Sequence, residues 1–148
     1  MITTLHLRPL SLQDTDWRTF VSLLTLADLP TPYLEDGGRF FLMEDETGLI
    51  GFGGLEGDGA DQLIQSVVMA PGLRRRGLGP RLVDQLVQQA KACGAERLWL
   101  LTTEADQFFA ELGWTAVEWD SAPEKVQGSR LFRDGGPATA VLIVRSLS

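Results

Sequence analysis

The 148-residue chain is poor in the residues from which disulfides and His/Cys metal sites are built. It has one cysteine, Cys93, which excludes an internal disulfide, and one histidine, His6, which leaves no histidine–cysteine cluster for a metal. A single cysteine fits a reducing compartment, so we expect a cytoplasmic protein that uses no metal.

Long apolar runs and positive charge are also scarce. No apolar stretch approaches the ~20 residues of a membrane-spanning helix, and residues 1–6 lack the charged and apolar regions of a signal peptide. The 20 Asp and Glu outnumber the 13 Lys and Arg and give a formal net charge of −7. Because that charge repels nucleic acid and anionic lipid alike, we expect neither a nucleic-acid nor a membrane partner.

What is present, 44% hydrophobic and 22% charged residues, is ordinary for one globular domain, and no repeat or linker divides residues 1–148. Hydrophobic periodicity and turn residues predict strands at 5–8, 40–43, 49–55, 63–69, 98–101, 114–119 and 139–144, and helices at 11–26, about 80–93 and 104–112. We expect Cys93 to lie in the core at the end of an apolar helix stripe. This order predicts an α/β fold, a mixed α+β sheet with helices packed on it.

The scarce positive charge is concentrated at one turn. Four of the eleven arginines lie at residues 74–76 and 81, between the end of strand 63–69 and the first turn of helix 80–93, beside Gly77 and Gly79. The first amides of a helix have no internal partners, and glycines let an anion approach the backbone closely. The turn therefore indicates a phosphate site with a cationic rim, and a solvated basic turn is the alternative. It contains neither a Walker-type loop nor the third glycine of a dinucleotide-binding loop.

Two segments resemble signatures of the GNAT family of N-acetyltransferases. In residues 67–79, Arg74, Gly77 and Gly79 match the acetyl-CoA-binding pattern Gln/Arg-x-x-Gly-x-Gly/Ala, and residues 108–114 (Phe-Phe-x-x-x-Gly-Trp) resemble the second signature. The chain is therefore identified as a member of that family over nearly its whole length. The resemblance implies a GNAT-like acyl-CoA N-acyltransferase fold, with a central, mostly antiparallel sheet flanked by helices. It also implies acetyl-CoA as co-substrate and a small primary amine as acceptor.

Shorter strings, among them residues 53–56, 100–103 and 137–141, resemble the ArsN-type branch associated with arsenic resistance. That likeness implies an amino-acid-like arsenical or a phosphinic amino acid as the acceptor. Such an acceptor needs a cation for its acidic group, and Arg133, in the late segment of this likeness, is the preferred candidate over Arg39 and Arg130.

The family resemblance also implies the residues that bind the cofactor. Backbone amides hold the pyrophosphate of CoA, the main chain of the preceding strand pairs with the pantetheine arm, and the next strand diverges to admit the thioester. In this sequence the residues implied for the pyrophosphate are Arg75, Arg76, Gly77, Leu78 and Gly79, with Arg74 at the first motif position. The residues implied for the pantetheine arm are Val67, Val68 and Met69. Thr102 and Thr103 are implied to lie near the reaction centre, Thr102 towards the substrate.

The catalytic residues are less clearly marked. Many family members carry Tyr where this chain has Phe109, and a phenyl ring cannot protonate the departing thiolate. Phe108 and Phe109 are interpreted as a hydrophobic wall beside the cofactor. Glu56, after a central strand, is the candidate general base, with a solvated strand-end acid as the alternative. Tyr33, the sole tyrosine, lies in the loop that commonly covers the acceptor in this family and is the candidate acid or substrate-positioning residue, with packing as the alternative.

Three functions follow from these observations. The first is an N-acetyltransferase that transfers acetyl from acetyl-CoA to a small amine by direct attack through a tetrahedral intermediate. The second, motivated by Phe109, is a non-catalytic acyl-CoA-binding sensor module, and the third is a GNAT enzyme that acts on a protein or peptide amine. The sequence leaves the choice between monomer and homodimer open.

Overall fold

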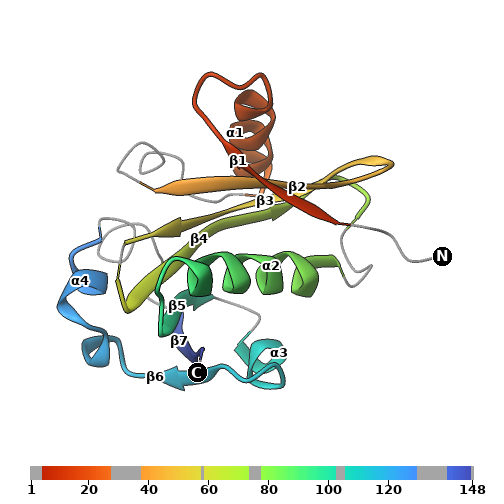
Figure 1. Cartoon of the computed structure of the whole chain (residues 1–148). Coiled ribbons are helices and arrows are strands. Elements are labelled where there is room, and N and C mark those ends of the chain that lie inside the picture. Colours follow the sequence, from red (N-terminus) through yellow and green to blue (C-terminus); the bar gives the residue numbers. More distant parts are fainter. Residues whose placement is uncertain are drawn as a thin grey trace.

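A mixed sheet of seven strands forms the centre of the computed structural model, which describes residues 5–27, 38–57, 59–73, 78–102, 106–129 and 140–147. The strands lie in the order β1-β2-β3-β4-β5-β7-β6, with α1 on one face of the sheet and α2 on the other (Figure 1). The strands are β1 (His6–Leu10), β2 (Arg39–Asp45), β3 (Gly48–Glu56), β4 (Asp61–Met69), β5 (Arg97–Thr102), β6 (Thr115–Val117) and β7 (Val141–Ser146). The helices are α1 (Asp16–Leu26), α2 (Leu78–Ala92), α3 (Asp106–Ala110), the 3-10 helix η1 (Trp119–Ser121) and α4 (Glu124–Gln127).

The sheet is antiparallel except where β4 pairs with β5, which confirms the predicted fold class. The predicted order of strands and helices is also confirmed, while several boundaries differ. The first helix begins at Asp16 and not at Ser11, because the Asp14 carboxylate accepts a hydrogen bond from the Ser11 amide (2.8 Å) and fixes a turn there. The polar segment after β6 contains η1 and α4.

Two hydrophobic cores lie on the two faces of the sheet, because successive strand residues point to opposite sides. Along β2, Phe40 and Leu42 pack into the core beneath α1, while Phe41 and Met43 pack into the core beneath α2. The apolar stripe predicted for α2 is confirmed, since its buried residues are Leu82, Val83, Leu86, Val87 and Ala90. The prediction for Cys93 is wrong: it follows the last helical residue and is exposed in the turn that Gly94 makes with a φ of 93°.

Glycines in β3 let α2 and β4 lie close to this strand. A Cβ on Gly53 would stand 2.7 Å from Cδ1 of Leu86, and one on Gly51 would stand 2.6 Å from the carbonyl oxygen of Val68. Real Cβ atoms essentially never come so near, so these positions exclude any side chain without a shift. The glycines therefore fix the distance between α2 and the sheet.

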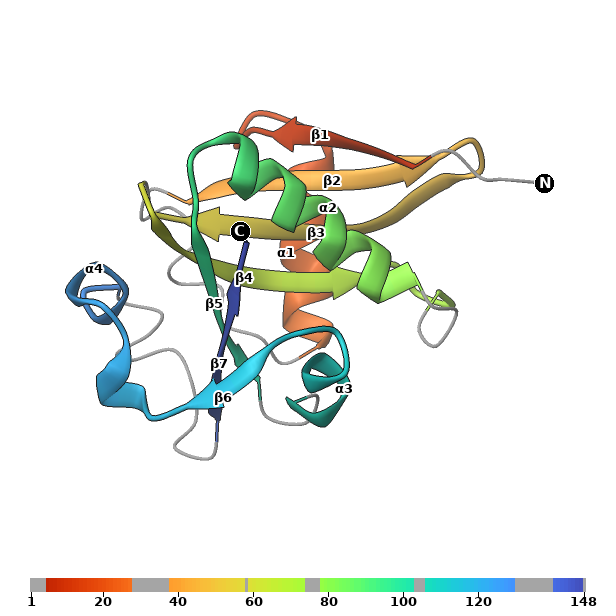
Figure 2. The ribbon, with the colours of Figure 1, turned by 60° about the horizontal axis from the view of Figure 1, so that its bottom comes forward.

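The strands β4 and β5 separate soon after they begin to pair. Their parallel register covers the pairs Asp61–Arg97, Gln62–Leu98 and Leu63–Trp99, and β5 then pairs with β7 along its whole length. The two strands run in clearly different directions beyond this point (Figure 2). The sheet thus opens between β4 and β5 towards their carboxyl ends.

Candidate active site

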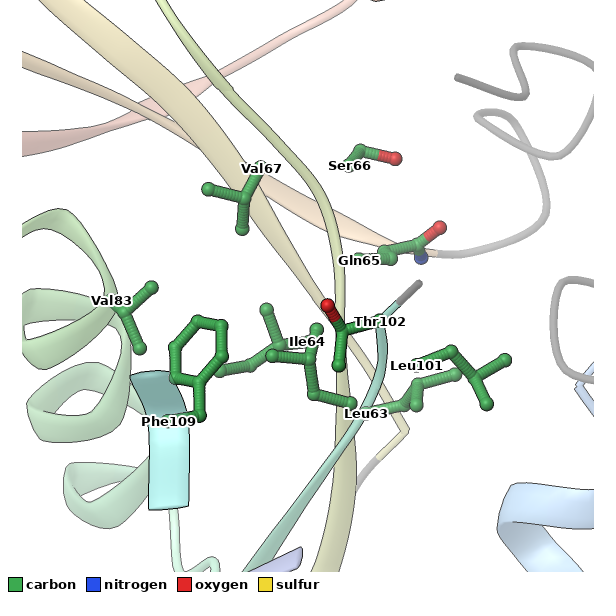
Figure 3. Close-up of a pocket in the computed structure, with 10 residues that line it drawn as sticks. Leu63, Ile64, Gln65, Ser66, Val67, Val83, Leu101, Thr102 and Phe109 are labelled. Carbon is green, nitrogen blue, oxygen red and sulfur yellow. The ribbon is translucent and has the colours of Figure 1, made fainter. Parts of the chain in front are cut away.

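A cavity of about 280 Å³ lies where β4 and β5 separate. Figure 3 shows residues from both strands around it, together with Val83 of α2 and Phe109 of α3. Its lining residues are Leu63, Ile64, Gln65, Ser66, Val67, Val83, Leu100, Leu101, Thr102 and Phe109. An apolar cavity with a few polar groups at an interruption of a sheet has the character of a small-molecule site.

A β-bulge in β4 shapes one wall of this cavity. Phe52 is paired with Val68 and Gly54 with Gln65, so Ser66 and Val67 together oppose a single residue of β3. Ser66 has a φ of 58°, in the left-handed region that a residue other than glycine seldom adopts. Bulges redirect side chains and interrupt the backbone ladder, and strained residues of this kind gather at functional sites. The bulge therefore makes this stretch of β4 a candidate functional segment.

The wall next to α2 is apolar. Val67 points towards α2, where Val83 and Phe109 complete the wall (Figure 3). The ring of Phe109 packs edge-on against Phe108 and Trp114, with centroid distances of 5.5 and 5.7 Å. Phe109 therefore lies where the sequence places a hydrophobic wall, whereas the side chain of Phe108 is 47% exposed. Their contact with a cofactor stays a prediction.

The other side of β4 carries a polar cluster around Glu56, at the end of β3. Gln65 and Ser66 point away from α2 in Figure 3. Oε1 of Glu56 accepts hydrogen bonds from Nε2 of Gln65 at 3.3 Å and from Oγ of Ser129 at 3.0 Å. Both donors are buried, at 3% and 4% exposure, although side chains of this kind usually face water. Glu56 itself does not line the cavity; Gln65 lies between them.

Arg39, one candidate cation for an acidic acceptor, makes hydrogen bonds outside the Glu56 cluster. Its guanidinium donates to the carbonyl of Gly57 at 3.0 Å and to Oε1 of Gln62 at 2.6 Å. Leu55, directly opposite Arg39 in the ladder, packs in the core beneath α2. Cross-strand partners share a face, so Arg39 and Glu56 lie on opposite faces of the sheet.

The remaining predicted residues fall into two groups. Thr102 ends β5 and lines the cavity, Val68 and Met69 continue β4, and Leu78 and Gly79 begin α2. A Cβ added to Gly79 would meet none of the described residues within 4 Å. The predicted residues Tyr33, Arg74, Arg75, Arg76, Gly77, Thr103 and Arg133 lie outside the described residues.

A hydrogen-bonded clamp closes the end of the opening where β4 and β5 still pair. Arg97 donates to both carboxylate oxygens of Asp61, at 2.7 and 2.9 Å, and the indole of Trp99 donates to the same carboxylate at 2.9 Å. The bond from Arg97, followed by that from Trp99, lowers the pKa of Asp61. The side chain of Asp61 thus holds β4 to β5 below the cavity.

The sequence analysis did not select Gln65, Ser66 or Ser129. A polar Gln-Ser pair inside the apolar run 63–69 is a signal of an interrupted strand, and it points to the bulge. Ser129 gives no such signal, because its partner is 73 residues away in the sequence. Within the described part of the chain, no cluster of three His, Cys, Asp or Glu residues is arranged to hold a metal, and no helix is long and apolar enough to cross a membrane.

Comparison with known proteins defines the class to which this site belongs. Residues 9–114 match the model of the acetyltransferase (GNAT) family, which is most of the chain, and the chain belongs to this family. The amino-acid acetyltransferase of Neisseria meningitidis serogroup B is 28% identical over 118 residues, which cover 76% of this chain and 26% of that protein. The amino-acid acetyltransferase of Escherichia coli K12 is 36% identical over 58 residues, 39% of this chain and 13% of that protein. The chain thus spans about a quarter or less of the length of these relatives.

Solved structures confirm the fold. The N-acetylglutamate synthase of Neisseria gonorrhoeae, solved with coenzyme A and N-acetyl-glutamate, superimposes with a TM-score of 0.80 at 22% identity and covers 100% of this chain and 36% of its own. A GNAT acetyltransferase of Elizabethkingia anophelis with acetyl-CoA bound gives a TM-score of 0.68 at 18% identity, with 96% and 97% of the two chains covered. The predicted GNAT acyl-CoA N-acyltransferase fold is therefore confirmed.

Proposed function

We propose that this chain is an N-acetyltransferase that moves an acetyl group from acetyl-CoA to the primary amine of a small, amino-acid-like molecule. The observation that carries the proposal is the cavity between β4 and β5, in a chain of the GNAT family. Its wall next to α2 is apolar, and a carboxylate with two buried hydrogen-bond donors lies on the other side of β4. Such a cavity suits a thioester arriving from one side and an amine arriving from the other.

Acetyl-CoA occupies the α2 side in this proposal. The pantetheine arm pairs with the main chain of β4 from Val67 to Met69, and the apolar wall with Phe109 covers it. The pyrophosphate lies on the backbone amides of residues 75–79, with Arg74 at the rim and Phe108 and Thr103 close to the cofactor. The support is that α2 begins at Leu78, within this segment, and that the first amides of a helix have no internal partners and suit an anion. The structures of several relatives contain coenzyme A or acetyl-CoA.

The chemistry is a direct attack. The amine nitrogen forms a bond to the thioester carbon, and the carbonyl oxygen of the tetrahedral intermediate takes up negative charge at a backbone amide of β4 near Val68. The carbon–sulfur bond then breaks and releases CoA as the thiolate, while the carboxylate of Glu56 accepts the amine proton through a water. Phe109 supplies no proton, and none is required, because a thiol with a pKa not far above about 8.5 leaves readily as the anion.

An amino acid is the favoured acceptor class, because both curated relatives described above are amino-acid acetyltransferases. The amino-acid-like arsenicals and phosphinic amino acids suggested by the ArsN-type likeness carry the same α-amine. Arg133 is the proposed partner of the acidic group, Tyr33 positions the acceptor, and Thr102 lies beside the reacting atoms at the end of β5.

The test measures release of CoA thiol from acetyl-CoA over a panel of amines, with calorimetric titration of acetyl-CoA alongside. The panel contains α-amino acids including glutamate, phosphinic and arsinic amino acids, and short peptides with free amines. Release stimulated by amino acids supports the proposal, and release stimulated by peptides alone supports the protein-amine alternative. Binding of acetyl-CoA without any release favours the sensor module, and the absence of binding overturns both CoA-based functions.

A further inference from the structure

We infer that Gln65 and Ser129 are positioning residues that hold the carboxylate of Glu56 in the orientation needed to take up the amine proton. The inference rests on the proposed function, because it assigns roles around the same site. It starts from an asymmetry of the carboxylate. Both hydrogen bonds end on Oε1, and among the described residues Oε2 accepts none. One oxygen is thereby anchored, while the other remains available to a water or an amine.

The two donors are themselves held in place. Ser129 follows α4, and its amide donates to the carbonyl of Val126 at 3.1 Å. Val126 is 3% exposed and packs with Leu63 of β4 in a third hydrophobic cluster. The hydroxyl of Ser129 is therefore tied to β4 through a buried side chain, and its position relative to Glu56 is fixed by packing.

Gln65 is enclosed from the opposite direction. A Cβ on Gly38 would stand 2.9 Å from Nε2 of Gln65 and 2.8 Å from the ring of Phe40. The side-chain amide of Gln65 thus packs against the backbone of Gly38, where a larger residue would have no space. Since Gln65 also lines the cavity, it forms the link between the anchored carboxylate and the space where the reaction takes place.

Burial makes this arrangement costly unless the polar groups bond to one another. Removing one of the two buried donors leaves the half-buried carboxylate of Glu56 less well satisfied and more mobile. For a base, mobility lowers the fraction of time spent in the productive geometry, and this affects the chemical step more than the binding of the amine. A purely structural role predicts a loss of stability that is unrelated to Glu56.

A double-mutant cycle on the full chain separates these roles. In the wild-type background we expect Ser129→Ala and Gln65→Met each to lower kcat by about 3- to 10-fold with KM for the amine changed by less than about 2-fold. We expect Glu56→Gln to lower kcat by about 100-fold or more. In the Glu56→Gln background, Ser129→Ala should change kcat by less than about 2-fold, because the group that it positions has lost its function.

Two further variants control the cycle. Ser129→Thr keeps the hydroxyl and should restore most of the activity lost in Ser129→Ala, while Ser121→Ala removes an exposed hydroxyl that bonds to the Glu118 carbonyl and should leave kcat unchanged. Equal effects of Ser129→Ala in both backgrounds, or no effect in either, overturn the inference. Full activity of Glu56→Gln overturns it too and leaves acetyl transfer standing. Binding of acetyl-CoA without turnover by any amine instead refutes the proposed function.

Discussion

Gly79, the second residue of α2, offers a way to separate cofactor binding from folding. Its backbone is outside the left-handed region, and an added Cβ would meet no atom of the described residues within 4 Å. Packing within the described part of the chain therefore gives no reason for a glycine at this position. We expect Gly79→Ala to keep the fold and to weaken the binding of acetyl-CoA, because the methyl group would stand where the pyrophosphate approaches the backbone.

The two effects have opposite signs and can be estimated. Alanine is favoured over glycine within a helix by up to about 1 kcal/mol, so the free energy of unfolding should stay equal or rise by up to that amount. A methyl group forced into a close contact costs about 1–3 kcal/mol. Since 1.4 kcal/mol corresponds to a tenfold change, the Kd for acetyl-CoA should rise by about 5- to 150-fold.

Urea unfolding measures the first effect and calorimetric titration of acetyl-CoA the second. Gln88→Gly is the matched control, because Gln88 is exposed on the same helix: it should lower the free energy of unfolding by up to about 1 kcal/mol and leave the Kd unchanged. Gly79→Val should weaken binding more than Arg75→Ala, which removes a side chain at the rim. If Gly79→Ala is stable and binds acetyl-CoA as the wild type does, the pyrophosphate does not lie on the amides of this turn.

Three other changes test the walls of the cavity. Asp61→Asn should lower the free energy of unfolding at pH 7 by about 1–2 kcal/mol, a value reduced because Arg97 is half-exposed. Because the pKa of Asp61 is lowered in the fold, its contribution to stability is present above the ordinary pKa of about 3.9 and is lost as the pH falls through the folded value. The free energies of unfolding of variant and wild type, measured from pH 7 to 2, should therefore converge at low pH. A constant difference between them would show that the ionised carboxylate is not the source of the stabilisation. Gly51→Ala should destabilise the chain by about 1–3 kcal/mol in urea unfolding, because its Cβ would stand 2.6 Å from the Val68 carbonyl; an unchanged midpoint would show that β3 and β4 can separate freely at this point. Phe109→Tyr should change kcat by less than about 3-fold if the thiolate leaves without an acid, whereas a gain near the 100-fold scale of acid catalysis would show that protonation limits the rate.

The sequence was sufficient for the order of the elements and for the apolar stripe of α2. These depend on local patterns: the apolar stripe of α2 repeats at helical spacing, and the strands of the sheet are short apolar runs between turn residues. The family signatures then defined the class of fold. The start of α1 was misplaced because the Ser11–Asp14 turn uses the same residue types as a helix cap.

The polar cluster around Glu56 could not be predicted in the same way. Glu56 itself was selected, but Ser129 reaches it across 73 residues of chain. The position of Arg39, on the face of the sheet opposite to Glu56, could not be predicted either, because it depends on the register of β2 against β3. Contacts of this kind are set by tertiary packing, for which a single sequence carries no periodic signal.

The place of β7 in the sheet has a consequence for assembly. β5 has three paired residues with β4 and six with β7, so the cavity wall on the β5 side is secured mainly by residues 141–146. During synthesis the earlier strands β1 to β4 and helix α2 can associate among themselves, whereas β5 remains weakly attached until β7 arrives. We therefore expect the β1 to β4 part of the sheet to associate first, and the reaction cavity, one wall of which is β5, to form only when β7 has paired.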